Sequence, residues 1–322
     1  MPRTASQNRT VGIVAGLVAA VAFATSGPVV KPLLVAGWSP GSAILVRLSV
    51  AALLLAGPAA WALRGRWWVL RAEWRTVLGF GVLGVATAST MYYLAVDRLP
   101  VAVALLIEYT GPLLLVAWRW ARERQAPARA TLVGAALATG GLVLVLDLTG
   151  SLELDPVGLV FALVSAVGNA AYFALTGRPT ELPAISLAGA GMAVGAVTVA
   201  LVAAAGILPL AAPDVRVDLL GAQVHWIVPL LIVATLPTAF AYGVSALSVR
   251  LLGERLASFL ALSEVLVAVL LAWALVGEAP LPLQIAGMVL VVAGIALVRR
   301  GTAVPEVPVV APPPLVVADA RA

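Results

Sequence analysis

Three ionisable side chains lie deep inside apolar stretches of the sequence. Arg47, Glu108 and Glu264 each lie about seven to nine residues inside an apolar run long enough to cross a bilayer. At 1.5 Å per residue, the carboxyl group of Glu108 would lie roughly 12 Å along its helix, at the depth of the hydrocarbon core. An ionisable side chain at that depth costs on the order of 3 kcal/mol unless it faces a bundle interior or a wet cavity. We therefore expect a polar site inside a helical bundle.

Each of these side chains has more than one possible role. The carboxylates of Glu108 and Glu264 could bind a proton or a substrate ammonium group, or they could be structural and hydrogen-bond across a helix interface. Arg47 could meet a substrate carboxylate, pair with Glu108, or extend to the outer membrane interface. Lys31, near the outer end of its run, is expected to reach that interface rather than to bind a ligand.

Glycine and proline interrupt several of the apolar runs. Such breaks free backbone carbonyl groups that lipid cannot satisfy, so they belong beside protein or water. The candidate helix breaks or gates are Gly27, Pro28, Gly111, Pro112 and Pro237. Tyrosines near these breaks could present hydroxyl groups to a small ligand or could pack between helices. The candidate ligand- or proton-binding residues are therefore Glu108, Tyr109, Arg47, Glu264, Tyr172 and Tyr242.

The chain as a whole is strongly apolar. Hydrophobic residues make up 62% of its 322 residues and charged residues only 11%, and the mean hydropathy is +1.07. These values predict an integral membrane protein. Long apolar runs without alternation favour helices over a membrane barrel. The formal charge of +5 comes from basic residues spread over short loops, so no nucleic-acid partner is expected.

We predict an all-α integral membrane protein with ten transmembrane helices. The predicted spans are 11–34, 40–63, 74–96, 100–121, 129–147, 156–175, 184–208, 225–250, 255–276 and 281–299. Ala22-Phe23-Ala24 resembles a signal-peptidase site, but the apolar run continues beyond it, so we expect no cleavage there. Residues 148–155 form an outer linker, and the proline-rich residues 300–322 are expected to be a disordered tail.

Basic residues predict the orientation in the membrane. With the N-terminus (1–10) inside, sixteen of the twenty Lys and Arg residues fall in inner segments. Only Arg98 and Arg216 fall in outer loops, while Lys31 and Arg47 lie within spans. We therefore expect a protein of the plasma (inner) membrane with both termini in the cytoplasm.

The sequence contains an internal repeat. Segment 126–145 aligns with 279–298 at a constant separation of 153 residues. Because five spans per copy is an odd number, the second copy (156–299) must enter the membrane from the side opposite to the first (11–147). Inverted repeats of this kind are typical of secondary transporters, with the substrate site between the copies. The matched pairs that support the alignment are Pro127 with Pro280, Gly134 with Gly287, and Gly141 with Gly294.

Several chemistries lack their usual residues. The chain has no cysteine and a single histidine, so neither a disulfide nor a Cys or His metal cluster is expected. It has no phosphate-binding loop and no nucleophile elbow, so ATP hydrolysis and serine hydrolase chemistry are not encoded. We expect no enzyme activity and no cofactor.

These features together resemble the EamA family of the drug/metabolite transporter superfamily. The resemblance covers about residues 11–299 and rests on the two five-helix copies, on Lys31 after a Ser-Gly-Pro break, on Arg47, and on the segment 277–280, Gly-Glu-Ala-Pro. The sequence Glu-Tyr-Thr-Gly-Pro at 108–112 is similar to the corresponding segment of threonine/homoserine exporters of the RhtA type.

Further positions agree with or depart from that exporter pattern. Glu264 falls where such exporters carry a second buried glutamate. Val265 stands where they often have proline, and Arg124-Gln125 replaces Gly-Glu at the end of the first copy.

The resemblance implies export of amino acids or related metabolites by alternating access. The expected partners are a small-molecule substrate, membrane lipid and a proton as coupling ion, and a homodimer is left open. Import, or transport of a drug, nucleobase or sugar derivative, is an alternative. A non-transporting membrane scaffold or sensor is an alternative of another class, although the short inner loops offer little docking surface.

Overall fold

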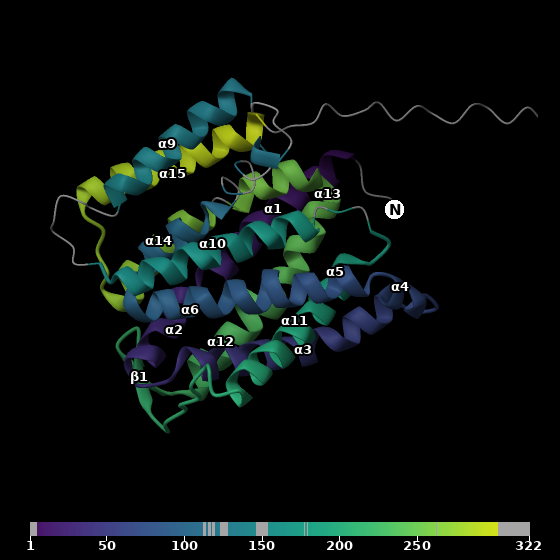
Figure 1. Cartoon of the computed structure of the whole chain (residues 1–322), viewed down its shortest axis with the longest axis horizontal. Coiled ribbons are helices and arrows are strands. Elements are labelled where there is room, and N and C mark those ends of the chain that lie inside the picture. The colour runs from purple at the N-terminus through teal and green to yellow at the C-terminus, as the bar shows by residue number, and fades with distance from the viewer. Residues whose placement is uncertain are drawn as a thin grey trace, which may run out of the picture.

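The computed structural model describes residues 5–111, 114, 117, 120–122, 128–145, 154–176, 178, 180–261 and 263–301. Pro112, most of the predicted outer linker and the tail beyond Gly301 lie outside these residues. The described part is almost entirely helical (Figure 1). Within it, six helical segments are long and apolar enough to cross a membrane: Arg9–Val35, Pro40–Ala62, Trp74–Arg98, Pro156–Thr176, Ala184–Ala204 and Ile227–Ser245.

These six segments agree with six of the predicted spans, the first, second, third, sixth, seventh and eighth. They confirm a multi-pass membrane protein by length and composition. The total of ten spans stays a prediction.

One helix in the first half of the chain begins at a clear sequence signal. Ser39 caps one helix by accepting a hydrogen bond from the Ser42 N–H at 3.2 Å, and Pro40 occupies its first turn. The elements of this half are α1 (Ala5–Ala24), α2 (Ser26–Val35), α3 (Pro40–Ala62), α4 (Trp67–Ala72), α5 (Trp74–Gly79), η1 (Phe80–Thr87), α6 (Ala88–Arg98), α7 (Val101–Glu108) and α9 (Arg129–Val145).

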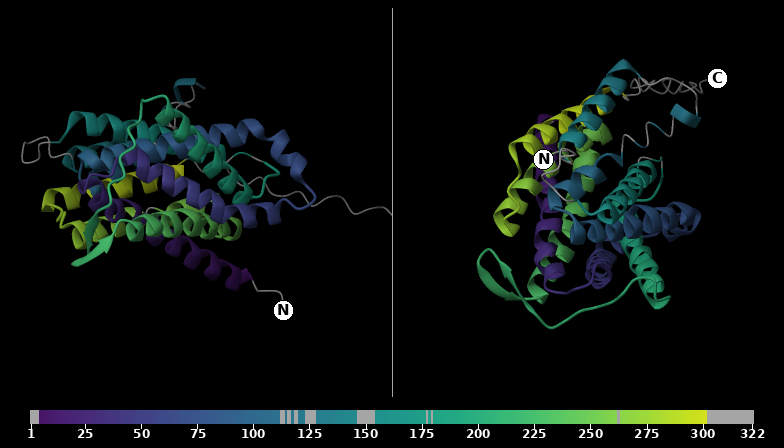
Figure 2. Two further views of the ribbon diagram at one scale, coloured as in Figure 1. Left: turned by 90° about the horizontal axis from the view of Figure 1, so that it is seen from below. Right: turned by 60° about the vertical axis from the view of Figure 1, so that its left-hand side comes forward.

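The second half adds a short hairpin to the helices. Its elements are α10 (Pro156–Thr176), α11 (Ala184–Ala204), β1 (Arg216–Leu219), β2 (Ala222–His225), α12 (Ile227–Ala234), η2 (Thr235–Phe240), α13 (Ala241–Ala261), α14 (Ser263–Val276) and α15 (Pro282–Gly301). The antiparallel strands β1 and β2 depart from the all-α prediction. Leu220 and Gly221 join them with φ of 57° and 77°, as a tight two-residue hairpin turn requires. Figure 2 shows this hairpin at one end of the bundle.

The boundary between the predicted eighth and ninth spans is wrong. A loop was expected at 251–254, but α13 runs through these residues and ends at Ala261. The only helix-breaking residue in that stretch is Gly253, and one glycine costs about 1 kcal/mol without ending a helix. As a consequence, Glu264 lies in the first turn of α14 instead of nine residues into a helix.

Equivalent helices of the two halves pack against each other in antiparallel pairs. In α9 and α15, a Cβ on Gly141 would lie 2.5 Å from the Gly287 carbonyl oxygen, and one on Gly294 would meet the carbonyl of Gly134. Because late residues of each helix meet early residues of the other, the two helices run in opposite directions. They lie side by side along one edge of the bundle (Figure 1).

The halves are also interlocked. α1 packs on α13 of the second half, while α10 packs on η1 and α6 of the first half. Each copy therefore places its first helix against the third span of the other copy. These exchanges, together with the antiparallel pairs, agree with the predicted inverted repeat.

The third span of each copy contains a π-helical segment, which is η1 in the first copy and η2 in the second. The two segments overlap when the copies are aligned at 153 residues, because 80–87 corresponds to 233–240. π-Helical insertions leave backbone groups without their usual partners and are frequent at functional sites. In both segments a threonine hydroxyl donates to a carbonyl oxygen five residues earlier, Thr87 to Val82 and Thr238 to Val233.

Candidate functional site

A cavity of about 150 Å³ lies between the two repeats. From the first copy, its wall is formed by the end of α1, the start of α2, and α3, η1, α6 and α7. From the second copy, it is formed by α10, α13 and α14. All six residues that the sequence predicts to bind ligand or protons lie in its wall: Arg47, Glu108, Tyr109, Tyr172, Tyr242 and Glu264. The structure thus brings these residues together, while their role in binding stays a prediction.

Arg47 is held in the wall by hydroxyl groups. Its Nε donates to Thr238 Oγ1 at 2.7 Å, and its Nη1 donates to Ser26 Oγ at 3.1 Å. The guanidinium carbon also lies 5.3 Å from the ring centroid of Tyr93. Because the residue is only 7% exposed, the suggestion that it extends to the outer interface is wrong.

No carboxylate in the described part of the chain lies within 4.0 Å of the Arg47 guanidinium. The predicted alternative of a direct pair with Glu108 is therefore not seen. A buried guanidinium without a carboxylate partner is a strong site for an anionic group, since it presents five donors in a planar fork.

The hydroxyl partner of Arg47 directly follows the proline in η2. Pro237 has no N–H, so it cannot donate to the carbonyl of Val233 four residues earlier. Thr238 Oγ1 donates to that carbonyl oxygen instead, at 2.6 Å, and its lone pairs accept from Arg47. The hydroxyl that holds the guanidinium therefore lies directly beside the break at Pro237.

Glu108 is the last residue of α7, and the helix is interrupted immediately after it. Thr110 Oγ1 and the Thr110 N–H both donate to the Ile107 carbonyl, which closes the turn. The amide of Asn169 donates to Glu108 Oε1 at 3.5 Å, and its own carbonyl oxygen is buried without a partner among the described residues. Glu108 and Asn169 thus offer acceptor oxygens at the cavity.

Glu264 accepts a hydrogen bond from a residue of the first copy. The hydroxyl of Tyr109, directly after α7, donates to Glu264 Oε2 at 2.6 Å. This is a short bond, as expected when the acceptor is a carboxylate. With Arg47, Glu108 and Glu264, the cavity wall therefore carries one cationic and two acidic side chains.

Aromatic rings form another part of the wall. The rings of Tyr172 and Tyr242 meet edge to face with centroids 5.9 Å apart. Phe23 packs on Tyr242 at 5.2 Å, and Phe80 packs on Tyr172 at 5.4 Å. A small ligand in this cavity would contact an apolar surface beside the charged groups.

Of the predicted helix breaks, Gly27, Gly111 and Pro237 lie next to residues that line the cavity or hold Arg47. α1 ends at Ala24 and α2 begins at Ser26, so the first span is interrupted just before Gly27 and Pro28. Gly111 packs closely on α10, since a Cβ there would lie 2.6 Å from the Ala166 carbonyl oxygen. Whether these residues act as gates stays a prediction, and Pro112 lies outside the described residues.

Lys31 contacts groups of the protein near the ends of helices, and whether it also reaches the membrane interface stays a prediction. Its ammonium group donates to the carbonyl oxygens of Val96 and Leu99 at the end of α6. It also lies 4.0 Å from Glu278 Oε1, and its side chain is 13% exposed. These partners could not be predicted from sequence, because two of them are backbone carbonyl groups.

Comparison with known proteins gives a family and a fold. No protein with a curated description matches the sequence. A solved structure described only as "Crystal structure of protein" shares 20% sequence identity with the chain, with a TM-score of 0.58. The match covers 92% of this chain and 99% of the other, and at this identity it shows the fold alone. The sequence pattern of the EamA-like transporter family matches residues 10–147 and 156–300, so the chain belongs to the EamA-like transporter family.

Proposed function

We propose that this small-molecule transporter exports amino acids of the threonine or homoserine type across the plasma membrane by alternating access. The observation that carries the proposal is the presence of a cationic and two acidic side chains in the wall of one small cavity. Arg47 offers an anion site, and Glu108 with Asn169 offers acceptors for an ammonium group. An α-amino acid carries both complementary groups, a carboxylate and an ammonium.

The apolar part of the wall supports the same substrate class. The rings of Tyr172 and Tyr242 border the cavity and can contact a short side chain. A cavity of about 150 Å³ is small compared with the pockets of roughly 300 to 1,000 Å³ that hold drug-sized ligands. These features favour a small zwitterion over a drug-sized substrate.

The second carboxylate suggests how transport is coupled. Glu264 and Glu108 together exceed the single charge of Arg47, so a zwitterion alone would leave the cavity with a net negative charge. One proton taken up by either carboxylate would remove this charge. We therefore propose proton exchange as the driving reaction, with the substrate and the proton using the cavity in alternate half-cycles.

Efflux from loaded cells tests the proposal. Cells expressing the wild type are loaded with radiolabelled threonine and a mixed amino-acid panel, and efflux is compared with that of Glu108→Gln at matched membrane abundance. We expect wild-type efflux to exceed that of Glu108→Gln by roughly tenfold or more, since the variant keeps the volume but loses the charge. Glu181→Gln, at an exposed loop position, is the matched control and should behave as the wild type.

The outcomes separate the parts of the proposal. Efflux by wild type and Glu181→Gln, but not by Glu108→Gln, supports both the substrate class and the role of Glu108. Equal efflux by all three proteins would show that Glu108 is structural. If well-expressed wild type exports none of the amino acids, the substrate class is wrong, and counterflow with other solutes would follow.

A further inference from the structure

Lys31 joins the end of one helix to a loop of the other repeat. Its ammonium group donates to the carbonyl oxygens of Val96 and Leu99, the latter at 2.9 Å. These carbonyls lie at the end of α6, where the helix leaves acceptors unpaired and a positive charge is favoured. The same ammonium lies 4.0 Å from Glu278 Oε1, in the loop between α14 and α15.

Glu278 completes the connection at the start of the next helix. Its Oε2 accepts a hydrogen bond from the Val101 N–H at 2.7 Å. Val101 is the first residue of α7, where N–H groups are unpaired and a negative charge is favoured. The pair of Lys31 and Glu278 thus holds α2, the end of α6 and the start of α7 to the second repeat. Both side chains are largely shielded, with 13% and 20% exposure.

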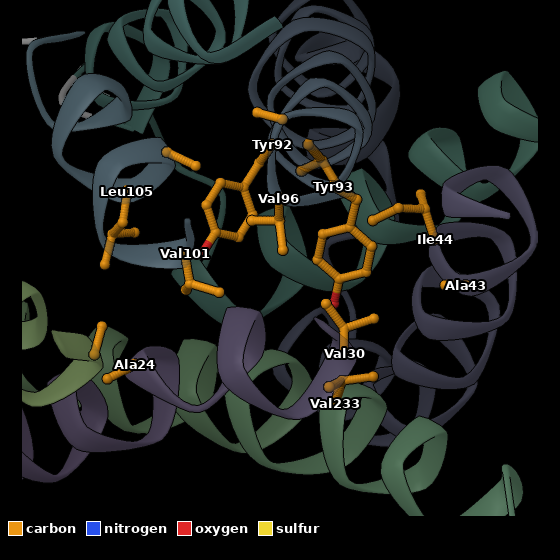
Figure 3. Close-up of a cluster of buried hydrophobic side chains, with 14 of the residues drawn as sticks. Ala24, Val30, Ala43, Ile44, Tyr92, Tyr93, Val96, Val101, Leu105 and Val233 are labelled. Atoms are coloured by element: carbon orange, nitrogen blue, oxygen red, sulfur yellow. The ribbon is translucent and has the colours of Figure 1, made fainter. Parts of the chain in front are cut away.

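A buried apolar layer separates this pair from the cavity. Gly27 lies one turn before Lys31 on α2, and a Cβ there would collide with Tyr92 and Val101. Tyr92 in turn lies one turn before Val96 on α6, and both are buried, as is Val101. Figure 3 shows the side chains of Tyr92, Val96 and Val101 packed together between the helices. Since Tyr92 also lines the cavity, this layer closes the cavity on the side of Lys31.

We propose that Lys31 and Glu278 form a latch that keeps the cavity closed toward the outer side of the membrane and that must separate in each transport cycle. The charge pattern of the sequence places this end of the bundle outside. The inference rests on the proposed alternating access, but not on the identity of the substrate. Opening would require α2 and the loop after α14 to move apart, which breaks the ion pair and exposes the apolar layer.

The latch belongs to one side of the membrane only. The 153-residue separation that relates Pro127 to Pro280 places Gln125 at the position of Glu278. The first copy therefore lacks a carboxylate at this position. Because only the outer side carries this carboxylate, we expect a resting state in which the cavity is closed on the outer side. The alignment places no charged residue equivalent to Glu278 on the inner side.

Cysteine labelling tests the latch without any substrate. The chain has no cysteine, so Ser89→Cys in the cavity wall provides a single reporter thiol. A membrane-impermeant maleimide is added to intact cells, and the initial labelling rate is measured. Adding Glu278→Gln should raise this rate roughly tenfold, as should Lys31→Met, because each removes the attraction between opposite charges that is present in the closed state only. The two changes together should raise it no further than either alone.

Two controls keep the result specific. Asp155→Asn breaks an exposed ion pair, Arg98 with Asp155 at 3.0 Å, and should leave the labelling rate unchanged. A second reporter, Ala138→Cys, is fully buried between α9 and α15 and should stay unlabelled in every variant.

The outcomes decide the proposal whether or not amino acids are exported. An unchanged Ser89→Cys rate in both latch variants would overturn it. A similar increase at Ala138→Cys would also overturn it, because Lys31 and Glu278 would then hold the fold rather than a gate. Labelling that rises only at Ser89→Cys, in a protein that exports no amino acid, would support the latch and reject the proposed substrate.

Discussion

The hydroxyl of Thr238 joins the backbone of η2 to the guanidinium of Arg47. It donates to Val233 O at 2.6 Å and accepts from Arg47 Nε at 2.7 Å, and the residue is completely buried. The substitution Thr238→Val keeps the shape of the side chain but removes the oxygen. It therefore removes one acceptor from a charged N–H and one donor from a carbonyl oxygen, both in the interior.

The expected magnitude follows from these two bonds. A buried group left unpaired costs about 1 to 3 kcal/mol, with charged groups at the upper end. We therefore expect Thr238→Val to lower the free energy of unfolding by about 3 kcal/mol, and to lower the melting temperature by roughly 6 °C. Thr238→Ser keeps the oxygen and loses one methyl group, so it should cost only about 1 kcal/mol.

Thermal unfolding of the purified protein in one detergent measures these differences. Thr198→Val is the matched control, since the Thr198 hydroxyl donates only to the carbonyl of Val194 in its own helix, at 2.8 Å. That carbonyl keeps its helical partner, so the loss should stay below about 1 kcal/mol. If Thr238→Val unfolds at the same temperature as Thr198→Val, the hydroxyl does not hold Arg47 as described.

Two further substitutions test the interface between the repeats. Gly141→Ala should destabilise the protein by about 2 kcal/mol or more, because its Cβ would lie 2.5 Å from a backbone oxygen of the facing helix. The neighbouring Gly140 has open space around it, so Gly140→Ala should be neutral or stabilising. Denaturant titration measures both, and equal effects would contradict the packing of α9 on α15. Tyr109→Phe removes the 2.6 Å bond to Glu264 and should cost about 2 kcal/mol in the same titration, and combining it with Glu264→Gln should cost less than the two changes separately.

The sequence was sufficient to predict the members of the candidate site but not their partners. Arg47, Glu108 and Glu264 stand out because charge inside an apolar run has few physical explanations. Hydropathy and repeat matching also predict the helical class and the inverted copies. Neither method reports which hydroxyl or carbonyl a buried charge will meet, because those partners come from helices far away in the sequence.

The errors have local causes of the same kind. The loop expected at 251–254 contains one glycine, Gly253, and a single glycine is too weak to stop α13. The partners of Lys31 were also not predicted. They are two carbonyl oxygens at the end of α6, and helix ends leave no sequence signal for a distant donor.

The choice of hydroxyl partners for Arg47 has a consequence for transport. An ion pair between Arg47 and Glu108 would neutralise both groups and hold the walls of the cavity together, so a solute would have to break that pair in order to bind. The hydroxyl groups of Ser26 and Thr238 instead accept hydrogen bonds from two of the guanidinium donors and leave its positive charge in place. The cavity can then offer separated positive and negative positions to a zwitterion. The helix breaks beside these two residues are therefore part of the chemistry of the site, because they place hydroxyl groups where a regular helix would place none.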